Sequence, residues 1–386
     1  MNTRQPIHLR RQAGFTLVEL LVAVAISLVL TLAITLMLVR YEGSRRTLTS
    51  TNDSSIGGAY VAYLLDRSVR SAGSGFTQSW KDSFGCQLLV ARSGTTKLPR
   101  STAFPAPFAS IPQTVRLAPV VVHAGAGTNG SDVLAVQTGA SGLGESALRV
   151  LTASATASQL RVPTTIGMRD GDLALVFQNN TECLMEQVSS GFVGSASDLL
   201  TFGGTYATAQ QNTTRLQDMG ATALAYVAPI GNVTGNLPQF QLLGVGPNAT
   251  LVAHDMLQLD GTDTVTALAD GVDDLRVLYG VDTNDDGRID SWQSPASSPW
   301  DAASLLSGSA AARTNLSRII ALRIGFMVRT SSPERTAVSP SSLTLFADLG
   351  NTLQVSRTLT SAEQRMRWRT VELTVPLRNV LLMPRP

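Results

Sequence analysis

The chain has 386 residues, and 44% of them are apolar, which is enough for a sizeable core in one large domain or two. Its 30 Lys and Arg residues against 28 Asp and Glu residues give a formal net charge of +2. This composition excludes a disordered chain, and its charge balance gives no sign of a nucleic-acid partner.

The N-terminal region is typical of a membrane anchor. The stretch from 15 to 39 is apolar apart from one acid, Glu19, and four hydroxyl residues, and it is long enough to cross a bilayer as a helix. Arginines precede it and no acidic residue lies among them, so the positive-inside rule predicts a cytoplasmic N-terminus and an exported remainder; they are Arg4, Arg10 and Arg11. A carboxylate at mid-span costs about 2.5 to 3.5 kcal/mol, which indicates that Glu19 has a function and a partner.

Two simpler explanations of the apolar run are a cleavable secretory signal and a plain signal anchor. A small-residue cleavage pattern exists at 23–25, but it falls in the middle of the run and leaves too short an apolar core. A plain anchor accounts for Arg11 and the run, although not for Glu19.

The stretch GFTLVEL, residues 14–20, resembles the processing site of type IV pilins and pseudopilins. The resemblance implies that a prepilin peptidase removes a basic leader, residues 1–14, by cleaving between Gly14 and Phe15, and then methylates Phe15. Glu19 would become the fifth mature residue. In a filament its carboxylate could neutralise the terminal ammonium of Phe15 on a neighbouring subunit and set the register between subunits, since each charge alone is costly in apolar surroundings.

The polar stretch from 40 to 72 keeps apolar residues at helical spacing and is expected to continue the same helix. A single helix from Phe15 to Ala72 would be roughly 85 Å long at about 1.5 Å per residue. Residues 15–39 would lie in the membrane or the filament core, and residues 40–72 would be periplasmic and pack on the head. Gly57-Gly58 is the point where we expect this helix to bend.

Residues 73–386 change to short β-type runs separated by turn residues, which predicts an antiparallel β-rich head, possibly of two subdomains. No strong helix signal returns. The expected fold class is therefore α+β, pilin-like, with a long N-terminal helix packed on a mainly antiparallel sheet. In the strand expected at 317–329, apolar residues alternate with Arg323 and Arg329, which predicts one buried and one solvated face. The strand candidates are 132–138, 171–178, 275–281, 317–329 and 369–377.

Within the type IV pilins and pseudopilins, the sequence of the head resembles one subgroup, the PilW-like minor pilins. The stretches that carry it are 171–176, 276–280 with the acidic loop 281–290, and the ending 375–379. This family implies a structural subunit of the priming complex at the pilus tip, needed for pilus assembly, twitching motility and adhesion. Its implied partners are other minor pilins, a tip adhesin, the major pilin, the prepilin peptidase and the inner-membrane assembly platform.

The acidic loop DTNDDGRID carries oxygen donors at every second position. This spacing predicts a structural Ca²⁺ site, with Gly287 at the sharp turn. Gln293 stands where a full helix-loop-helix motif would have Glu, so we expect a lone loop after a strand; a solvated Asp/Gly turn is the alternative. The expected ligands are Asp282, Asn284, Asp286, Asp290 and the carbonyl of Arg288.

The two cysteines, Cys86 and Cys183, both lie in the exported part, where an oxidising compartment favours a disulfide between them; two free buried thiols are the alternative.

The remaining signals give no catalytic set, and we expect no enzyme activity. The glycine-rich stretch 125–130 fits a dinucleotide fingerprint but precedes a strand, so a hairpin loop is favoured. His123 and His254 are expected to be structural or surface residues, because no HExxH, GxSxG or Cys/His cluster accompanies them. Arg365, Arg367 and Arg369 alternate along an expected edge strand, where charge would oppose aggregation.

Two further functions remain open. A minor pseudopilin of a type II secretion system would share the leader and Glu19. A membrane-anchored Ca²⁺-binding envelope protein or enzyme would use the apolar segment only as a tether, and its Glu19 would be dispensable.

Overall fold

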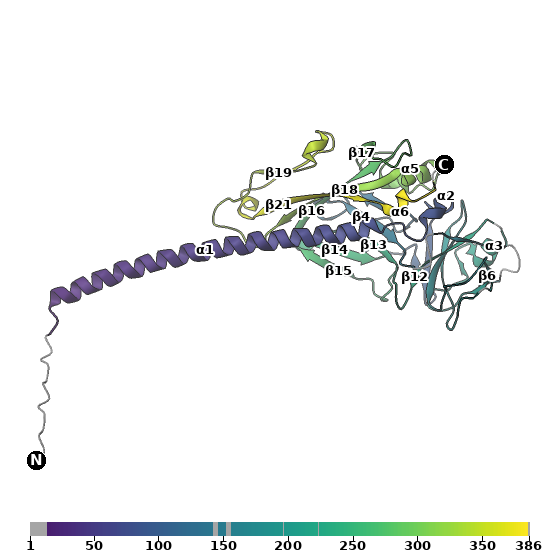
Figure 1. The fold of residues 1–386 in the computed structure, drawn as a ribbon, viewed down its shortest axis with the longest axis horizontal. Coiled ribbons are helices and arrows are strands. Elements are labelled where there is room, and N and C mark those ends of the chain that lie inside the picture. The colour runs from purple at the N-terminus through teal and green to yellow at the C-terminus, as the bar shows by residue number, and fades with distance from the viewer. Residues whose placement is uncertain (1–13, 142–145, 152–155, 196, 223, 385–386) are drawn as a thin grey trace, which may run out of the picture. The chain divides into compact units, whose positions relative to one another are not determined.

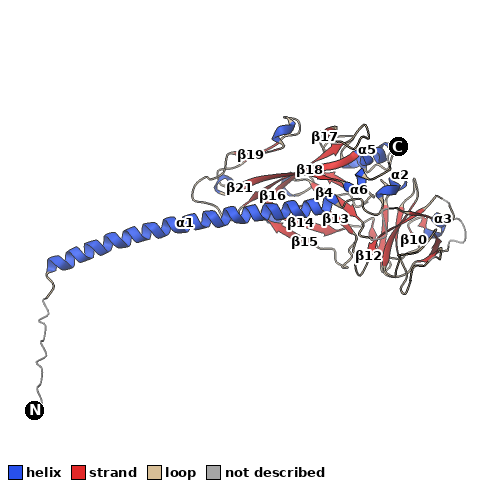
Figure 2. Cartoon of the chain, in the orientation of Figure 1, coloured by secondary structure: helices blue, strands red, loops and turns tan. Residues whose placement is uncertain are grey.

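The computed structural model describes residues 14–141, 146–151, 156–195, 197–222 and 224–384, with no side chains described for 42–54. Residues 1–13 of the expected leader lie outside the described part. The chain forms two compact units, one ending at Asp53 and the other comprising Ser54–Pro386. Past the first helix, the regular structure of the second unit is mainly strands, and its helices are short (Figure 2).

The first helix, α1, spans Leu17–Arg70 and confirms the predicted long helix (Figure 1). In the second unit, Val61, Leu65 and Val69 recur at four-residue spacing on one face and are fully buried in the core. The helix passes through Gly57 and Gly58 without interruption. A Cβ atom at Gly58 would lie 3.3 Å from Val371 Cγ2, so glycine there lets the helix approach the sheet closely.

The head confirms the α+β prediction, with a mainly antiparallel arrangement (Figure 1). A six-stranded sheet has the order β2(Thr95–Leu98), β1(Leu88–Arg92), β8(Cys183–Gln187), β7(Asp172–Phe177), β12(Tyr226–Asn232), β5(Leu148–Arg149). A five-stranded sheet has the order β15(Val265–Asp270), β14(Thr250–Asp255), β13(Gln239–Gly246), β4(Val133–Thr138), β3(Val120–His123). A four-stranded sheet has the order β17(Ser291–Gln293), β16(Val272–Val281), β18(Ile319–Arg329), β21(Trp368–Pro376). Three two-stranded pairs are β10(Gln210–Gln211) with β11(Thr214–Arg215), β19(Ser342–Leu345) with β20(Val355–Thr358), and β6(Gln159–Arg161) with β9(Leu199–Thr201).

Within the described strands, β1 and β8 form the one parallel pair, with Leu88 opposite Cys183. Short helices complete the head: α2(Trp80–Ser83), α3(Leu216–Gly220), α4(Ala302–Leu305), α5(Ala310–Arg318) and α6(Arg378–Leu381). The expectation that no strong helix follows α1 is wrong at α5. Ser309 caps this helix by accepting a hydrogen bond from the amide of Ala312, and buried Ala312 and Leu316 hold it to the core.

The strand β18 is covered on both faces, so the expected wet face is wrong. Its burial pattern is nearly continuous, with Arg323 and Arg329 half-buried. The β19–β20 hairpin covers the second face, where Met327 packs in a small apolar cluster with Phe346. Arg323 lies on this face, pairs with Asp348 and sits over the Phe346 ring. A hairpin distant in sequence thus encloses a strand face that alternation alone marks as solvated.

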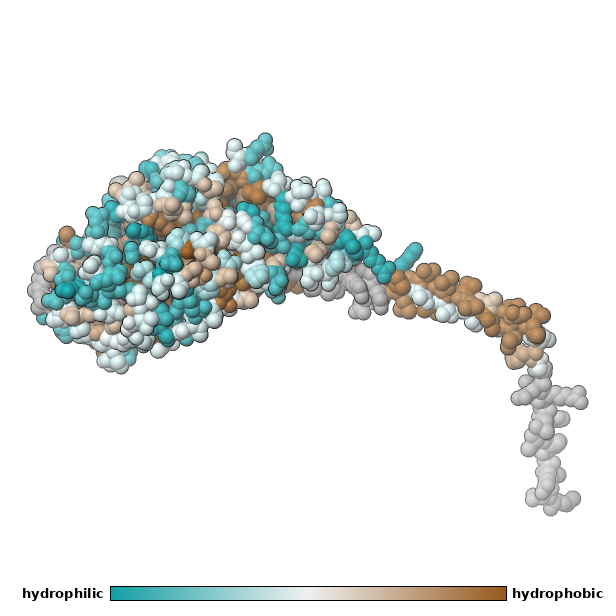
Figure 3. Space-filling view, turned by 180° about the vertical axis from the view of Figure 1, so that it is seen from behind, coloured by the Kyte–Doolittle hydropathy of each residue, from teal (hydrophilic) through white to brown (hydrophobic). Residues whose placement is uncertain are grey.

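Two larger cores lie elsewhere in the head. One packs the buried face of α1 with the five-stranded and four-stranded sheets. The other lies on the face of the six-stranded sheet that points away from the first core, around Leu89, Val176 and Leu200. The surface over these cores is mixed in polarity, whereas the described helix up to Tyr41 presents an almost unbroken apolar surface (Figure 3).

Candidate functional site

The N-terminus of α1 carries the predicted processing and registration residues. Gly14 and Phe15 precede the helix, and Thr16 is the capping residue. The amide and hydroxyl of Thr16 donate to Glu19 Oε2 at 3.0 and 2.9 Å, and the amide of Glu19 donates to Thr16 Oγ1 at 3.3 Å. This reciprocal pattern is a capping box, which satisfies two amides that a helix start leaves without partners.

The apolar part of this helix satisfies its own polar groups. Leu17–Tyr41 has a mean hydropathy of 2.8 and, by length and composition, could cross a membrane. Its hydroxyl groups at Ser27, Thr31 and Thr35 each donate to the carbonyl four residues earlier, at 2.6 to 2.7 Å. Between Leu17 and Val39, Glu19 is therefore the ionisable side chain that a bilayer would have to accommodate, and Arg40 follows at the end of the span.

The acidic loop connects β16 to β17 and is ordered by its own side chains. Asp282 is fully buried, and its two carboxylate oxygens accept hydrogen bonds from the amides of Asp286 and Gly287 at 3.2 and 2.7 Å. Asp286 Oδ1 accepts from the amide of Arg288 at 2.8 Å. Gly287 has φ +84°, as the predicted sharp turn requires.

The other two side chains expected as ligands, Asn284 and Asp290, lie in the same loop. Asn284 Oδ1 accepts from the amide of Asp286 at 3.0 Å. Asp290 Oδ2 accepts from the hydroxyl and amide of Thr283 at 2.6 and 2.7 Å, and these hydrogen bonds lower the pKa of Asp290. Across the described residues, no three His, Cys, Asp or Glu side chains converge as a ready metal cluster.

Comparison with known families supplies the deciding observation. The prokaryotic N-terminal methylation motif matches residues 9–35, and the family described as Type IV Pilus-assembly protein W, or PilW, matches residues 241–379. Both of these regions of the chain are type IV pilin-like. The methylation motif covers the capping box, and the PilW match runs from within β13 to the start of α6. No curated protein and no solved structure gives a significant match.

The two matches indicate the broad biology of this pilin-like protein. Both families belong to type IV pilus systems, which implies association with other pilus components, and the apolar N-terminal helix is consistent with a membrane anchor. Families of this kind are generally structural and not enzymatic.

The disulfide prediction is confirmed for this pilin-like protein. Cys86 and Cys183 are bonded with their Cα atoms 5.7 Å apart, and both are buried. The bond ties the segment after α2 to β8, next to the parallel pairing of β1 with β8. It therefore fixes one end of the six-stranded sheet close to the segment that follows α1.

The glycine-rich stretch, the two histidines and the three arginines, for which no catalytic role was expected, all lie in the pilin-like head. The glycine-rich stretch 125–130 connects β3 to β4 as a hairpin, and His123 and His254 are both buried. The expected alternation of three arginines is wrong, although β21 is an edge strand. Arg365 lies in a 3₁₀ turn before β21, Arg367 pairs with Glu334, and Arg369 donates to Ser55 Oγ.

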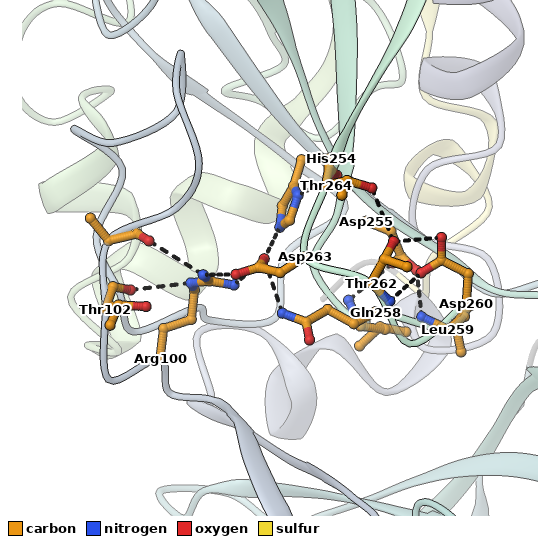
Figure 4. Close-up of polar contacts among 12 residues, drawn as sticks. Arg100, Thr102, His254, Asp255, Gln258, Leu259, Asp260, Thr262, Asp263 and Thr264 are labelled. Atoms are coloured by element: carbon orange, nitrogen blue, oxygen red, sulfur yellow. Dashed lines mark hydrogen bonds and ion pairs between the residues drawn. The ribbon is translucent and has the colours of Figure 1, made fainter.

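Two features of this pilin-like protein were not among the sites predicted from the sequence. The T-x-x-E spacing of Thr16 and Glu19 is a readable capping signal, and it was available in the sequence. The polar network of Arg100, His254 and Asp263 joins segments 163 residues apart, and no local pattern announces it (Figure 4).

Proposed function

We propose that the chain is a minor type IV pilin of the priming complex at the pilus tip, needed for pilus assembly, twitching motility and adhesion. It would be held in the inner membrane with its head in the periplasm until it enters the extracellular pilus. The PilW match carries this proposal, because it lies in the head, where a pseudopilin and a shaft subunit would differ from a tip subunit. The second unit, Ser54–Pro386, is bulky for a repeating shaft subunit, whereas a terminal position has room.

The proposed assembly step uses the residues at the start of α1. Prepilin peptidase would cleave between Gly14 and Phe15 and methylate Phe15. The amide of Thr16 belongs to the peptide bond between Phe15 and Thr16, so the capping box would survive cleavage. Its contacts use Glu19 Oε2, and Oε1 is left to approach the terminal ammonium of Phe15 on a neighbouring subunit.

A Glu19→Ala variant tests this step, because it removes the carboxylate but leaves the cleavage site intact. We expect normal removal of the leader and a loss of the protein from sheared pili, together with reduced piliation. Val18→Ala is the matched control, since it shortens a neighbouring apolar side chain without removing a charge. Normal incorporation of Glu19→Ala would contradict the charge-pairing role, and a requirement for protein secretion without any pilus defect would favour the type II secretion alternative.

We also propose that the acidic loop binds Ca²⁺ as a structural ion, with Asp282, Asn284, Asp286, Asp290 and the Arg288 carbonyl as ligands. The donor set fits, because all its members are hard oxygens and a carboxylate has about four acceptor positions, so the amide contacts leave capacity for a cation. Bound Ca²⁺ would supply positive charge that draws the loop side chains together. Asp290 would have to exchange part of its contact with Thr283.

Calcium binding is testable on the full-length protein in detergent micelles. We expect calorimetric heat on adding Ca²⁺, and a stabilisation of about 2.7 kcal/mol when free Ca²⁺ is 100 times Kd. Asp282→Ala should abolish both effects. Asp285→Asn is the control, because Asp285 lies in the same loop outside the ligand set. Absence of heat and of any shift in Tm at millimolar Ca²⁺ would leave the loop as a solvated turn.

A further inference from the structure

The strand β21 forms an open edge of the four-stranded sheet (Figure 1). It pairs with β18 over its whole length without a bulge, and among the described residues no strand lies on its other side. With nine residues it is the longest edge strand in the described part of the chain, and the next longest, β15, has six. Long open edges pair readily with other strands, so proteins either protect them or use them for binding.

Two backbone hydrogen bonds establish which residues of β21 face outwards. The amide of Leu377 donates to the carbonyl of Ile320 at 2.8 Å, and the carbonyl of Arg367 accepts from the amide of Thr330 at 3.0 Å. Because the register is continuous between these two points, the odd-numbered residues of β21 direct their backbone groups towards β18. The even-numbered residues direct theirs outwards, and in the open stretch these are Thr370, Glu372 and Thr374.

The outward backbone groups of this stretch, which we call the β21 edge, are accessible to a partner. They make no hydrogen bond with the described residues, and Glu372 and Thr374 are exposed. Both ends of the stretch are closed, because the amide of Trp368 donates to Ser339 Oγ and Pro376 has no amide hydrogen. The β21 edge therefore offers three donors and three acceptors in a row, one of each from every outward residue.

The β21 edge lacks the devices that commonly keep strand edges apart. It contains no proline and no lysine. Its one charged side chain, Glu372, is already engaged, because Oε2 accepts from Arg323 at 2.7 Å and Oε1 accepts from the amide of Phe346 at 2.8 Å. Arg369, directly before the edge, donates to Ser55 on α1. Neither charge guards the outward backbone groups.

We propose that the β21 edge pairs with an extended strand from a different pilin-like subunit of the same tip complex, which adds a fifth strand to the sheet. This inference rests on the proposed function. Side chains of the added strand would alternate between two environments. On the α1 side they would lie beside Val371 and Leu373, which pack against the main core, so apolar residues are favoured there. On the other side they would lie beside Glu372 and two threonines, so polar residues are favoured.

The direction of α1 argues against a second copy of the chain as this partner. Ser55 contacts Arg369, and Asn379 donates to the carbonyl of Ser71 at 2.9 Å, so this part of α1 runs in the same direction as β21. Two copies would most simply pair their β21 strands antiparallel about a twofold axis, and their α1 helices would then run in opposite directions. Subunits with their heads on one side of a membrane have parallel helices. A different subunit, which contributes another of its strands, avoids this conflict.

A proline at position 374 tests the proposal, because the amide of Thr374 faces outwards. Thr374→Pro removes this amide hydrogen and its ring obstructs an added strand, whereas the hydrogen bonds between β18 and β21 remain. We expect the full-length variant in detergent micelles to unfold at the same urea concentration as the wild type. An affinity-tagged variant purified from native membranes should recover at least about tenfold less of a pilin-like subunit, which mass spectrometry identifies by its methylated N-terminus.

The matched controls separate the outward amide from the side chain and from the fold. Thr374→Ala keeps the amide hydrogen and should recover the pilin-like subunit as the wild type does. Leu373→Pro removes an amide that faces β18, so this variant should unfold at a lower urea concentration.

Recovery of the pilin-like subunit at wild-type levels by a folded Thr374→Pro variant would overturn the β21 edge as an interface and leave the proposed function standing. A wild-type chain that recovers no pilin-like subunit and is absent from sheared pili would contradict the proposed function, and this partner with it.

Should Thr374→Pro not fold, a photo-cross-linking residue, p-benzoylphenylalanine, in place of Thr374 decides in cells with wild-type piliation. A light-dependent adduct with another pilin-like subunit supports the proposal, provided that the same residue in place of Thr213, exposed at the β10–β11 turn, gives no such adduct. An adduct with a second copy of the chain alone, or no adduct, overturns it.

Discussion

Removing the Cys86–Cys183 disulfide should destabilise the head strongly, and the size of the effect follows from the fold. The bond closes a loop with a sequence separation of 97 residues. In the chain-entropy model, a loop of this size limits the unfolded chain enough to contribute about 4 to 5 kcal/mol. A domain is typically stable by about 5 to 15 kcal/mol, so this loss is a large fraction of the total. Both sulfurs are buried, and alanine is therefore a better replacement than serine, whose hydroxyl would need a partner.

The assay is urea unfolding of full-length Cys86→Ala/Cys183→Ala in detergent micelles, followed by tryptophan fluorescence. We expect the free energy of unfolding to fall by about 4 kcal/mol, and wild-type protein treated with reductant to fall by a similar amount. Adding reductant to the double variant should change nothing further. A loss below about 1 kcal/mol in both would refute the reasoning, because the loop closure would then not limit the unfolded state of this chain.

Further substitutions at Thr16, at Gly57 and Gly58, and at Glu186 test individual contacts. Thr16→Val should remove the capping box and weaken the first turn by about 1 kcal/mol, whereas Thr16→Ser should keep it; pili from the valine variant should contain less of the protein, with processing unchanged. Gly57→Ala should raise the free energy of unfolding by about 0.5 to 1 kcal/mol, because no atom lies near its added methyl group, whereas Gly58→Leu should lower it by about 1 to 3 kcal/mol through collision with Val371 and Val328; urea unfolding measures both. Burial raises the pKa of Glu186 to about 7, so the folded state favours the protonated carboxyl. As pH rises from 4.5 to 7, the free energy of unfolding of the wild type should fall by up to about 3 kcal/mol through this group, and Glu186→Gln should flatten that part of the pH profile.

The elements that could be predicted from sequence are those with strong local patterns. The helix expected at 15–72 is observed as Leu17–Arg70, because its apolar residues recur at helical spacing over many turns. The strand expected at 171–178 is observed as β7, Asp172–Phe177, and the one at 369–377 as β21, Trp368–Pro376. Gly171 precedes β7 and Asn179 and Asn180 follow it, whereas β21 comes after a 3₁₀ turn and leads into α6.

The sequence was less informative where distant segments meet. Both faces of β18 are covered because the β19–β20 hairpin packs on one of them, and Arg323 and Arg329 on that face led to the expectation that it is solvated. The expected strand start at 317 was early, because α5 continues to Arg318 before the strand begins at Ile319.

The candidate sites divide in the same way. Gly14, Phe15 and Glu19 form a contiguous motif, and the acidic loop is a single hairpin connection, so both could be located from residue order alone. The pairing of Arg100 with Asp263 depends on how two sheets pack, and its residues could be identified only in the folded chain.

The most direct test of the account is the intact mass and N-terminal sequence of the protein recovered from native membranes. We expect a mature chain that begins with methylated Phe15, which would establish prepilin-peptidase processing and the pilin role of the N-terminal helix. An unprocessed chain that begins at Met1, in cells whose major pilin is normally processed, would contradict the account and leave the apolar helix as a simple tether.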